Sequence, residues 1–253
     1  MSIPPPRACR RVPDVDSKLL AWGRASAARD RGWCSFPHRH PRARPGDLDK
    51  PNAATGPGVR PGDDGVVGRG DHVGCNGVRI PTLWLFTDSK RLPDLRASVA
   101  RLPYGRAGVV FRHDDHPDRV RLCRDIARIC RARRLLLVIA GDVRLAAAVR
   151  AGVHLRGGRW PGPARVKGLV TSSAHNLTDL HRAARAGARL AFLAPVFVTR
   201  SHPGAPSLGP TRWSALARAV SIPVAALGGV DGVLVRGLPA GLCRAVGAIG
   251  ALA

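Results

Sequence analysis

The sequence predicts an α/β fold, a compact (β/α)8 TIM barrel, that follows a mostly disordered N-terminal extension. From residue 80 onward, short apolar runs alternate with segments of helical periodicity, and this alternation is typical of a parallel sheet covered by helices. The apolar runs number eight, which is the number of strands that closes such a barrel. An open, flavodoxin-like sheet is the alternative, but it would use about five strands and leave the others without a place.

The individual elements follow from the position and period of the apolar residues. Strands are expected over 82–88, 107–111, 135–140, 152–155, 166–170, 190–193 and 223–227, and an eighth begins at 245 and leads into a helix. Helices are expected over 92–102, 118–133, 143–150, 177–186 and 212–220. The barrel segment is shorter than the ~250 residues that are usual for this architecture, so the fourth and seventh helices should be stunted.

The segment over 118–133 is the clearest amphipathic helix. Its spacing indicates that Val120 and Cys130 face inward among other apolar residues, whereas its arginines face solvent. Cys123 lies seven positions before Cys130 on the same helix, and the chain has neither a CxxC pair nor a histidine cluster at zinc-ligand spacing. We therefore expect both cysteines to be buried free thiols.

The N-terminal part differs from the rest, and we predict two domains, an extension over 1–79 and a barrel over 80–253. Proline, glycine, arginine and aspartate dominate the extension, so it cannot bury enough apolar area to offset its ordering entropy. The segment over 17–28 could form a brief helix, but it has nothing obvious to pack on. Met1 is the single methionine, so the extension is either a disordered tail or a mis-assigned start, with the true start near Val73 or Val78.

The formal net charge of +24 raises the question of a nucleic-acid partner. The chain contains no glutamate, its cations are mostly arginine, and no basic motif is interleaved with aromatic residues. This pattern indicates a composition bias, so nucleic acid is disfavoured and a small phosphorylated molecule is the expected partner. No apolar run is long enough to span a bilayer and the first residues lack a signal core, so we expect no membrane association and a cytoplasmic location.

In a barrel, ligands bind where the strands end at their carboxyl side. The strand over 190–193 is followed by a polar loop that contains Thr199, Ser201 and His202. Gly228 and Gly229 follow the seventh strand, and another glycine-bearing turn follows the eighth. Barrels commonly hold a phosphate at these last two turns, because backbone N–H groups there can approach an anion.

Short motifs recur along the barrel in a characteristic order: LWLFTD at 83–88, GVHL at 152–155, SAH at 173–175, APVFVT at 194–199 and PVAALGGV at 223–230. Together they resemble the thiamin phosphate synthase / thiazole tautomerase family over residues 81–253. The resemblance implies a (β/α)8 barrel and an enzyme of thiamin biosynthesis. In this family, the synthase joins a hydroxymethylpyrimidine pyrophosphate to a thiazole phosphate with Mg²⁺ on the pyrophosphate, and the tautomerase isomerises the thiazole phosphate by proton transfer.

The resemblance also implies roles for individual residues. Arg112 would meet the pyrophosphate, and His175 matches the position that serves the tautomerase as acid and base. The pyrimidine and pyrophosphate pocket would be lined by Ser173, Thr199, Ser201 and His202. The thiazole phosphate would be held by Gly228, Gly229, Ile249 and Gly250.

Several positions depart from the synthase pattern, and most concern the metal. Ala140 and Gly141 replace an Asn-Asp pair, Arg159 replaces the second Mg²⁺-binding aspartate, and Asp142 is the one candidate metal ligand that remains. Val110 and Asp114 replace a glutamine and a lysine on either side of Arg112, and His202 replaces a lysine. Because Mg²⁺ prefers carboxylate oxygens, these losses favour other hypotheses over an ordinary synthase.

Three functions therefore stay open. The first is a divergent synthase in which Arg112, Arg200 and His202 neutralise the pyrophosphate. The second is a metal-independent isomerase of the tautomerase kind that uses His175. The third is a non-catalytic barrel that binds a phosphorylated ligand.

Overall fold

The computed structural model describes residues 16–29, 79–164, 168–199, 204 and 206–252 of the chain. Eight parallel strands form a closed barrel in the order β1 to β8, and the pairing of β1 with β8 completes the ring. This closure confirms the predicted barrel and excludes the open sheet. The strands are β1 (Leu83–Phe86), β2 (Ala107–Phe111), β3 (Leu136–Ala140), β4 (Gly152–Leu155), β5 (Val170–Ala174), β6 (Leu190–Leu193), β7 (Val224–Leu227) and β8 (Cys243–Ala248).

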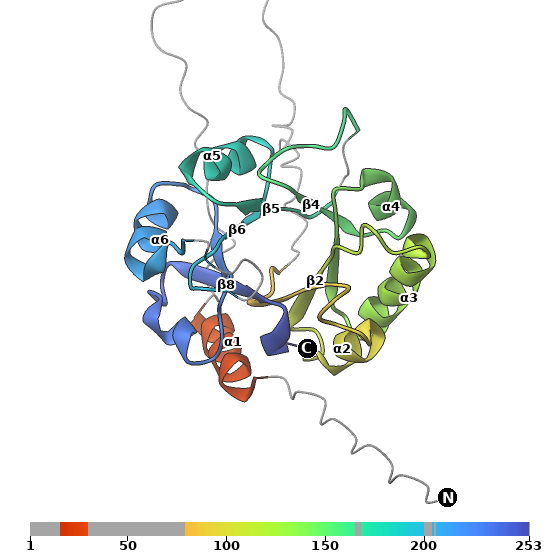
Figure 1. Cartoon of the computed structure of the whole chain (residues 1–253), viewed down its shortest axis with the longest axis horizontal. Coiled ribbons are helices and arrows are strands. Elements are labelled where there is room, and N and C mark those ends of the chain that lie inside the picture. The colour runs from red at the N-terminus through yellow and green to blue at the C-terminus, as the bar shows by residue number, and fades with distance from the viewer. Residues whose placement is uncertain (1–15, 30–78, 165–167, 200–203, 205, 253) are drawn as a thin grey trace, which may run out of the picture. The chain divides into compact units, whose positions relative to one another are not determined.

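Helices surround the ring of strands (Figure 1). They are α1 (Ser17–Arg29), α2 (Leu95–Arg101), α3 (Arg119–Ala132), α4 (Val143–Ala148), α5 (Leu177–Arg185) and α6 (Gly209–Arg218), with the 3₁₀ turns η1 (Leu234–Gly237) and η2 (Gly250–Leu252). The described residues between β4 and β5 contain no helix, and the short turn η1 connects β7 to β8. The expected stunting of the fourth and seventh helices is thus found. None of the helices in the described part of the chain is long and apolar enough to cross a membrane.

Two predictions about the elements were wrong. Val120 lies on α3 but is 48% exposed, because the buried stripe of that helix runs through Leu122, Ile126 and Cys130 instead. The fifth strand starts at Val170 and ends at Ala174, whereas the apolar run had indicated 166–170. Cys123 and Cys130 are free and buried, and burial raises the pKa of Cys123 to about 11 and that of Cys130 to about 12, as expected of inert thiols.

The inside of the barrel is filled by a few large rings set against small residues. Trp84, Phe86 and Phe192 meet edge to face, with ring centroids 5.6 Å apart for Trp84–Phe192 and 4.8 Å apart for Phe86–Phe192. A Cβ atom on Gly108 of β2 would lie 2.4 Å from the Trp84 ring, so the glycine makes room for the tryptophan. His154 of β4 also points inward, with its ring 5.5 Å from that of Phe86. Burial lowers the pKa of His154 to about 3, so its imidazole is neutral at physiological pH.

Helix α1 packs against the barrel, which corrects the expectation that the segment over 17–28 has nothing to pack on. It contacts β8 and η1, and Leu19 is completely buried. Gly23 allows a close approach to β1, because a Cβ atom there would lie 2.7 Å from the side chain of Leu83. The hydroxyl of Thr82 donates to the carbonyl of Gly23 over 3.0 Å. The helix therefore covers the seam where β1 and β8 close the barrel.

Candidate functional site

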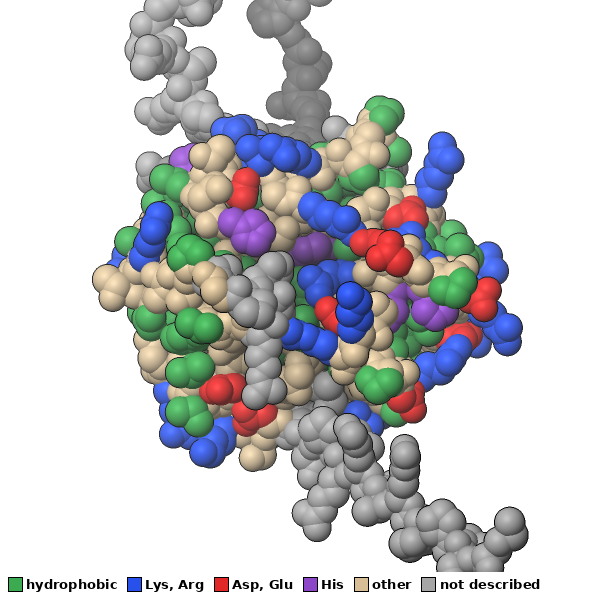
Figure 2. All heavy atoms as spheres, viewed as in Figure 1, with side chains coloured by type: hydrophobic (Ala, Val, Ile, Leu, Met, Phe, Trp, Pro, Cys, Tyr) green, Lys and Arg blue, Asp and Glu red, His purple; other side chains and the backbone are tan. Residues whose placement is uncertain are grey.

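The candidate site lies at the rim formed by the carboxyl ends of the strands. Arg112 follows β2, His175 follows β5, Thr199 lies in the loop after β6, and Gly228 and Gly229 follow β7. All strands of the closed barrel are parallel, so these residues belong to one rim of the molecule. Ser201 and His202, together with Arg200, lie outside the described residues. Figure 2, viewed in the same direction as Figure 1, shows basic side chains and histidines near the centre of the ring.

Arg112 continues the inward-facing series of β2. Alternate residues of a strand face the same side, so Arg112 follows Gly108 and Val110 and sits one layer above them. Its guanidinium carbon lies 5.4 Å from the centre of the Phe86 ring, which forms the upper layer of the barrel interior. Its Nε donates to the carbonyl of Thr87 over 3.2 Å, and one of its terminal nitrogens lies 3.8 Å from Asp88. Burial lowers the pKa of Arg112, and the charge of Asp88 acts in the opposite direction.

Arg156 is a second cation at the barrel mouth, and the sequence analysis did not identify it. It follows β4 two residues after the inward-facing His154, as Arg112 follows Val110. The pKa of Arg112 is lowered mainly by burial, and the positive charge of Arg156 acts in the same direction. The guanidinium of Arg156 also pairs with Asp114. The alternation of inward and outward side chains along β4 could have indicated Arg156, because it is the next alternate position after Gly152 and His154.

Asp142 is held in contacts that leave little for a metal ion. One of its oxygens accepts the backbone N–H of Leu145 over 2.8 Å and so caps α4. The other oxygen lies 2.5 Å from one terminal nitrogen of Arg119, and the second terminal nitrogen of Arg119 lies 3.4 Å from an oxygen of Asp114. Burial acts to raise the pKa of Asp142, but these hydrogen bonds and the charge of Arg119 outweigh it and keep the pKa below its usual value.

The donor set does not fit a Mg²⁺ ion. The described residues contain no group of three or more His, Cys, Asp or Glu side chains placed to hold a metal. Arg159, which the family resemblance places at the second carboxylate position, is a cation and cannot be a ligand. With Asp142 paired to Arg119, the rim presents guanidinium groups where a hard cation would need free carboxylates.

His175 joins the ends of β5 and β6. Its Nδ1 lies 2.9 Å from the carbonyl oxygen of Ala194, so Nδ1 carries a proton and donates it to that carbonyl. In the neutral ring, Nε2 is then unprotonated and available to accept a proton. The backbone N–H of His175 donates to Asp179 over 3.1 Å, so the residue is also fixed at the start of α5. The side chain is exposed, which leaves Nε2 open to a ligand at the rim.

Ser173 belongs to the end of β5 and organises the loop after β4. Its hydroxyl accepts the N–H of Gly157 over 3.2 Å. The neighbouring Ser172 was not identified from the sequence, and its buried hydroxyl accepts the N–H of Gly158 over 2.9 Å. Both hydroxyl groups thus shape the loop that carries Arg156.

The loops after β6 and β7 lie in close contact. Gly228 and Gly229 have φ values of 88° and 67°, which favour glycine. A Cβ atom on Gly229 would lie 2.4 Å from the carbonyl oxygen of Val198, next to the half-buried Thr199. The N–H of Phe197 also donates to the carbonyl of Gly228 over 3.1 Å. Close packing alone therefore demands glycine at these positions, whatever the turn binds.

The last turn of the site, after β8, contains Ile249 and Gly250. Ile249 is half-buried against the core, whereas Gly250 is exposed and begins η2. Because β7 and β8 are neighbours in the ring, the structure brings the two predicted phosphate turns side by side.

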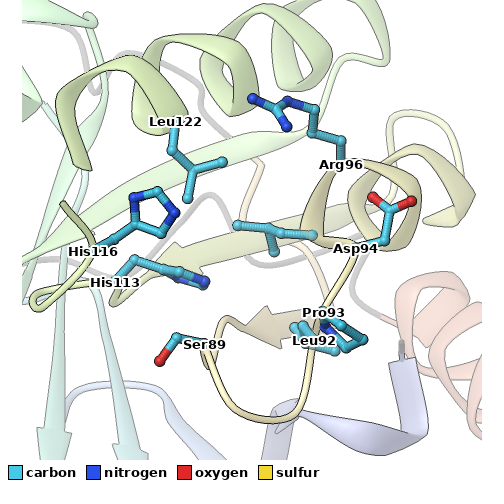
Figure 3. A pocket seen from close by; sticks show the side chains of 9 residues that line it. Ser89, Leu92, Pro93, Asp94, Arg96, His113, His116 and Leu122 are labelled. Atoms are coloured by element: carbon cyan, nitrogen blue, oxygen red, sulfur yellow. The ribbon is translucent and has the colours of Figure 1, made fainter. Parts of the chain in front are cut away.

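A small hollow lies outside the rim, between the loops that precede α2 and α3 (Figure 3). It has a volume of about 190 Å³ and its lining includes Leu92, Asp94, His113 and His116. The pKa of His113 is lowered mainly by burial, and its Nδ1 lies 3.0 Å from the hydroxyl of Thr87. Pockets for small ligands usually measure ~300–1,000 Å³, so this hollow is too small for a two-substrate site.

Comparison with known proteins gives a consistent picture. The sequence profile described as thiamine monophosphate synthase matches residues 83–248, from β1 to the end of β8. A putative thiamine-phosphate synthase 2 of Aquifex aeolicus is 33% identical over 163 residues, which cover 60% of this chain and 87% of the relative. A thiamine-phosphate synthase of Chlorobium phaeobacteroides is 31% identical and is covered over 78% of its length, with 60% of this chain.

Among solved structures, a thiamine phosphate pyrophosphorylase from Pyrococcus furiosus aligns with a TM-score of 0.56. The alignment covers 66% of this chain and 85% of that protein, at 22% sequence identity. At this identity the likeness supports the barrel fold and nothing finer.

Proposed function

Because the chain belongs to the thiamine monophosphate synthase family, we propose that it is an enzyme of thiamin biosynthesis that binds a thiazole phosphate at the rim of the barrel. We further propose that it is a transferase of the synthase kind, which joins the thiazole phosphate to a hydroxymethylpyrimidine pyrophosphate. The observation that carries this proposal is the pair of guanidinium groups at the barrel mouth: Arg112 lies over the Phe86 ring inside the barrel, and Arg156 follows β4 and pairs with Asp114.

The chemistry of the transfer explains why these cations matter. The methylene carbon of the pyrimidine gains a bond to the thiazole nitrogen and loses its bond to pyrophosphate, so negative charge grows on the leaving group. Guanidinium groups bind phosphate oxygens through paired, charge-assisted hydrogen bonds and stabilise such charge where water is excluded. Arg112 is held by Thr87 and Phe86, so it needs little reorganisation during the reaction.

In this proposal, the chain's own cations take over charge neutralisation from a metal. Three carboxylates of this part of the rim, Asp88, Asp114 and Asp142, are paired with arginines. The proposed transfer therefore includes no step that depends on Mg²⁺. The glycine turns after β7 and β8 would receive the thiazole phosphate.

Incubation of the full chain with both substrates tests the proposal, with thiamin phosphate detected after its oxidation to a fluorescent product. We expect product to form, and we expect a chelator to lower the rate by less than about tenfold. Absence of product with and without Mg²⁺ would overturn the transferase proposal. A loss of several hundred-fold with the chelator would show that a metal, and not the arginines, neutralises the leaving group.

A second candidate reaction, the metal-independent isomerisation of the thiazole phosphate, is favoured by one observation. His175 donates from Nδ1 to Ala194, which leaves Nε2 as a proton acceptor facing solvent. Incubation with the thiazole tautomer alone tests it, with His175→Asn compared against His181→Asn on the exposed side of α5. Isomerisation that survives unchanged in His175→Asn would exclude this role.

A further inference from the structure

The N-terminal segment reaches the rim at the two turns that follow β7 and β8. The backbone N–H of Asp16 donates to the carbonyl of Ala251 over 3.0 Å. One carboxylate oxygen of Asp16 accepts the N–H of Gly232 over 2.7 Å. Asp16 thus links the turn after β8, at Ala251, to the loop after β7, at Gly232.

The same carboxylate also starts α1. Its second oxygen accepts the N–H groups of Lys18 and Leu19 over 2.9 and 3.1 Å. Burial acts to raise the pKa of Asp16, but the hydrogen bonds from Gly232, Leu19 and Lys18 outweigh it and lower the pKa below its usual value. The group is therefore a carboxylate at neutral pH, with both oxygens engaged.

Gly232 is shaped to receive Asp16. A Cβ atom on Gly232 would lie 2.4 Å from the Cβ of Lys18 and 2.5 Å from a carboxylate oxygen of Asp16. Any side chain at this position would push the start of α1 away from the loop. The burial of Leu19 and the bond from Thr82 to Gly23 hold the remainder of α1 against the barrel.

From these contacts, we propose that Asp16 is a positioning residue of the phosphate site, which clasps the turns after β7 and β8 in the geometry that the ligand needs. The proposal rests on the proposed function, because it takes these two turns as the thiazole phosphate site. It also makes residues 16–29 a working part of the enzyme, although they lie outside the segment that the family profile matches.

Two substitutions in the full chain break the clasp from opposite sides. Asp16→Asn keeps an oxygen to cap α1 but turns an amide donor toward the N–H of Gly232. Gly232→Ala adds a methyl group that meets Lys18 and Asp16. The matched controls are Asp94→Asn, which caps α2 away from both turns, and Gly237→Ala, where nothing lies within 4 Å of the added methyl group.

The readouts separate positioning from general stability. We expect Asp16→Asn and Gly232→Ala to raise the KM for the thiazole phosphate about tenfold, with the KM for the pyrimidine pyrophosphate changed less than twofold. Hydrogen exchange over residues 228–233 should become faster in both variants, and both controls should match the wild type. An unchanged thiazole phosphate KM, or an equal rise in both KM values, would overturn the proposal.

A titration with inorganic phosphate keeps this test independent of the proposed function. If the wild type forms no thiamin phosphate, the proposed reaction fails, but the clasp still predicts weaker phosphate binding and faster exchange in Asp16→Asn. Equal phosphate affinity in wild type and Asp16→Asn would then refute the positioning role itself.

Discussion

The rim of this barrel has two halves that would recognise anions in different ways. The first half, which we call the charged half, follows β1 to β4 and carries charged side chains. Its ion pairs join three arginines to three aspartates: Arg112 to Asp88, Arg119 to Asp114 and Asp142, and Arg156 to Asp114. From β5 to β8, the rim has glycine turns that contact one another through the backbone. The first half is built from residues close to the strands, whereas the second is fastened by Asp16, far away in the sequence.

The difference suggests that each half of the rim binds one of the two phosphate-bearing ligands. Guanidinium groups suit a pyrophosphate that gains charge as it leaves, because their charge is fixed and their hydrogen bonds are paired. Backbone N–H groups suit a phosphate that only needs to be held, because they add no charge that would also attract the other ligand.

Arg112→Ala should give the largest effect, because it removes the guanidinium group that we propose faces the leaving pyrophosphate. It leaves the glycine turns of the other half unchanged. We expect kcat/KM for the transfer to fall by about 100–1,000-fold, as for the loss of one preorganised donor at a developing anion. Steady-state kinetics measure the change in kcat/KM. The control is Arg106→Ala, which lies at the opposite end of β2. A loss below about fivefold would show that Arg112 does not face the leaving group.

Leu19→Ala should destabilise the second half through α1. We expect the free energy of unfolding to fall by about 2–3 kcal/mol, toward the lower end for buried leucines, because one side of α1 faces solvent. Urea denaturation measures it, with Leu177→Ala on α5 as the control, since that side chain is 37% exposed. Equal, small losses in both variants would mean that α1 does not pack on the barrel in solution.

His154, buried inside the barrel below the charged half of the rim, should make the free energy of unfolding depend on pH. His154 is held neutral with a folded pKa of about 3, whereas an unfolded histidine has a pKa of about 6.5. The unfolded state therefore binds more protons between these values, and stability falls as pH drops below about 6.5, at up to ~1.4 kcal/mol per unit. His113, whose pKa is also lowered mainly by burial, adds to the same trend.

Denaturant unfolding between pH 7 and pH 5 measures this slope. His154→Gln should flatten it, because the replacement has no proton to gain. A variant with the wild-type slope would show that His154 is not buried as a neutral ring.

Asp142→Asn should have the smallest effect, and it tests whether Asp142 binds a metal ion. Asparagine still caps α4, so we expect a loss of stability of less than ~1 kcal/mol and a loss of activity of less than about tenfold. Kinetics at several Mg²⁺ concentrations provide the measurement. A shift of the Mg²⁺ dependence to much higher concentration would identify Asp142 as a metal ligand.

The sequence predicted most of the fold because local patterns decide it. The strands over 107–111, 152–155 and 190–193 agree with β2, β4 and β6, since each is a short apolar run with a clear end. The fifth strand was misplaced because Thr171 and Ser172 are polar but buried and Ser173 is half-buried, with hydroxyl groups bonded to neighbouring strands and loops. Hydrophobicity alone cannot identify a strand of this kind.

The site was only partly predictable, since it depends on contacts between distant parts of the chain. The family resemblance named Arg112, His175 and the glycine turns, and their roles remain predictions. Arg156 was missed because its place depends on the alternation of β4, which continues past the end of the apolar run at Leu155. Asp16 was missed because no local pattern indicates that a carboxylate would meet Gly232 across the chain.

One pair of titrations tests the division of the rim most directly. Inorganic pyrophosphate and the thiazole phosphate are titrated separately into the wild type, Arg112→Ala and Asp16→Asn by calorimetry. The account predicts that Arg112→Ala weakens pyrophosphate binding at least tenfold and leaves the thiazole phosphate unchanged, and that Asp16→Asn does the reverse. If each variant weakened both ligands equally, or neither, the two halves of the rim would not be separate binding sites.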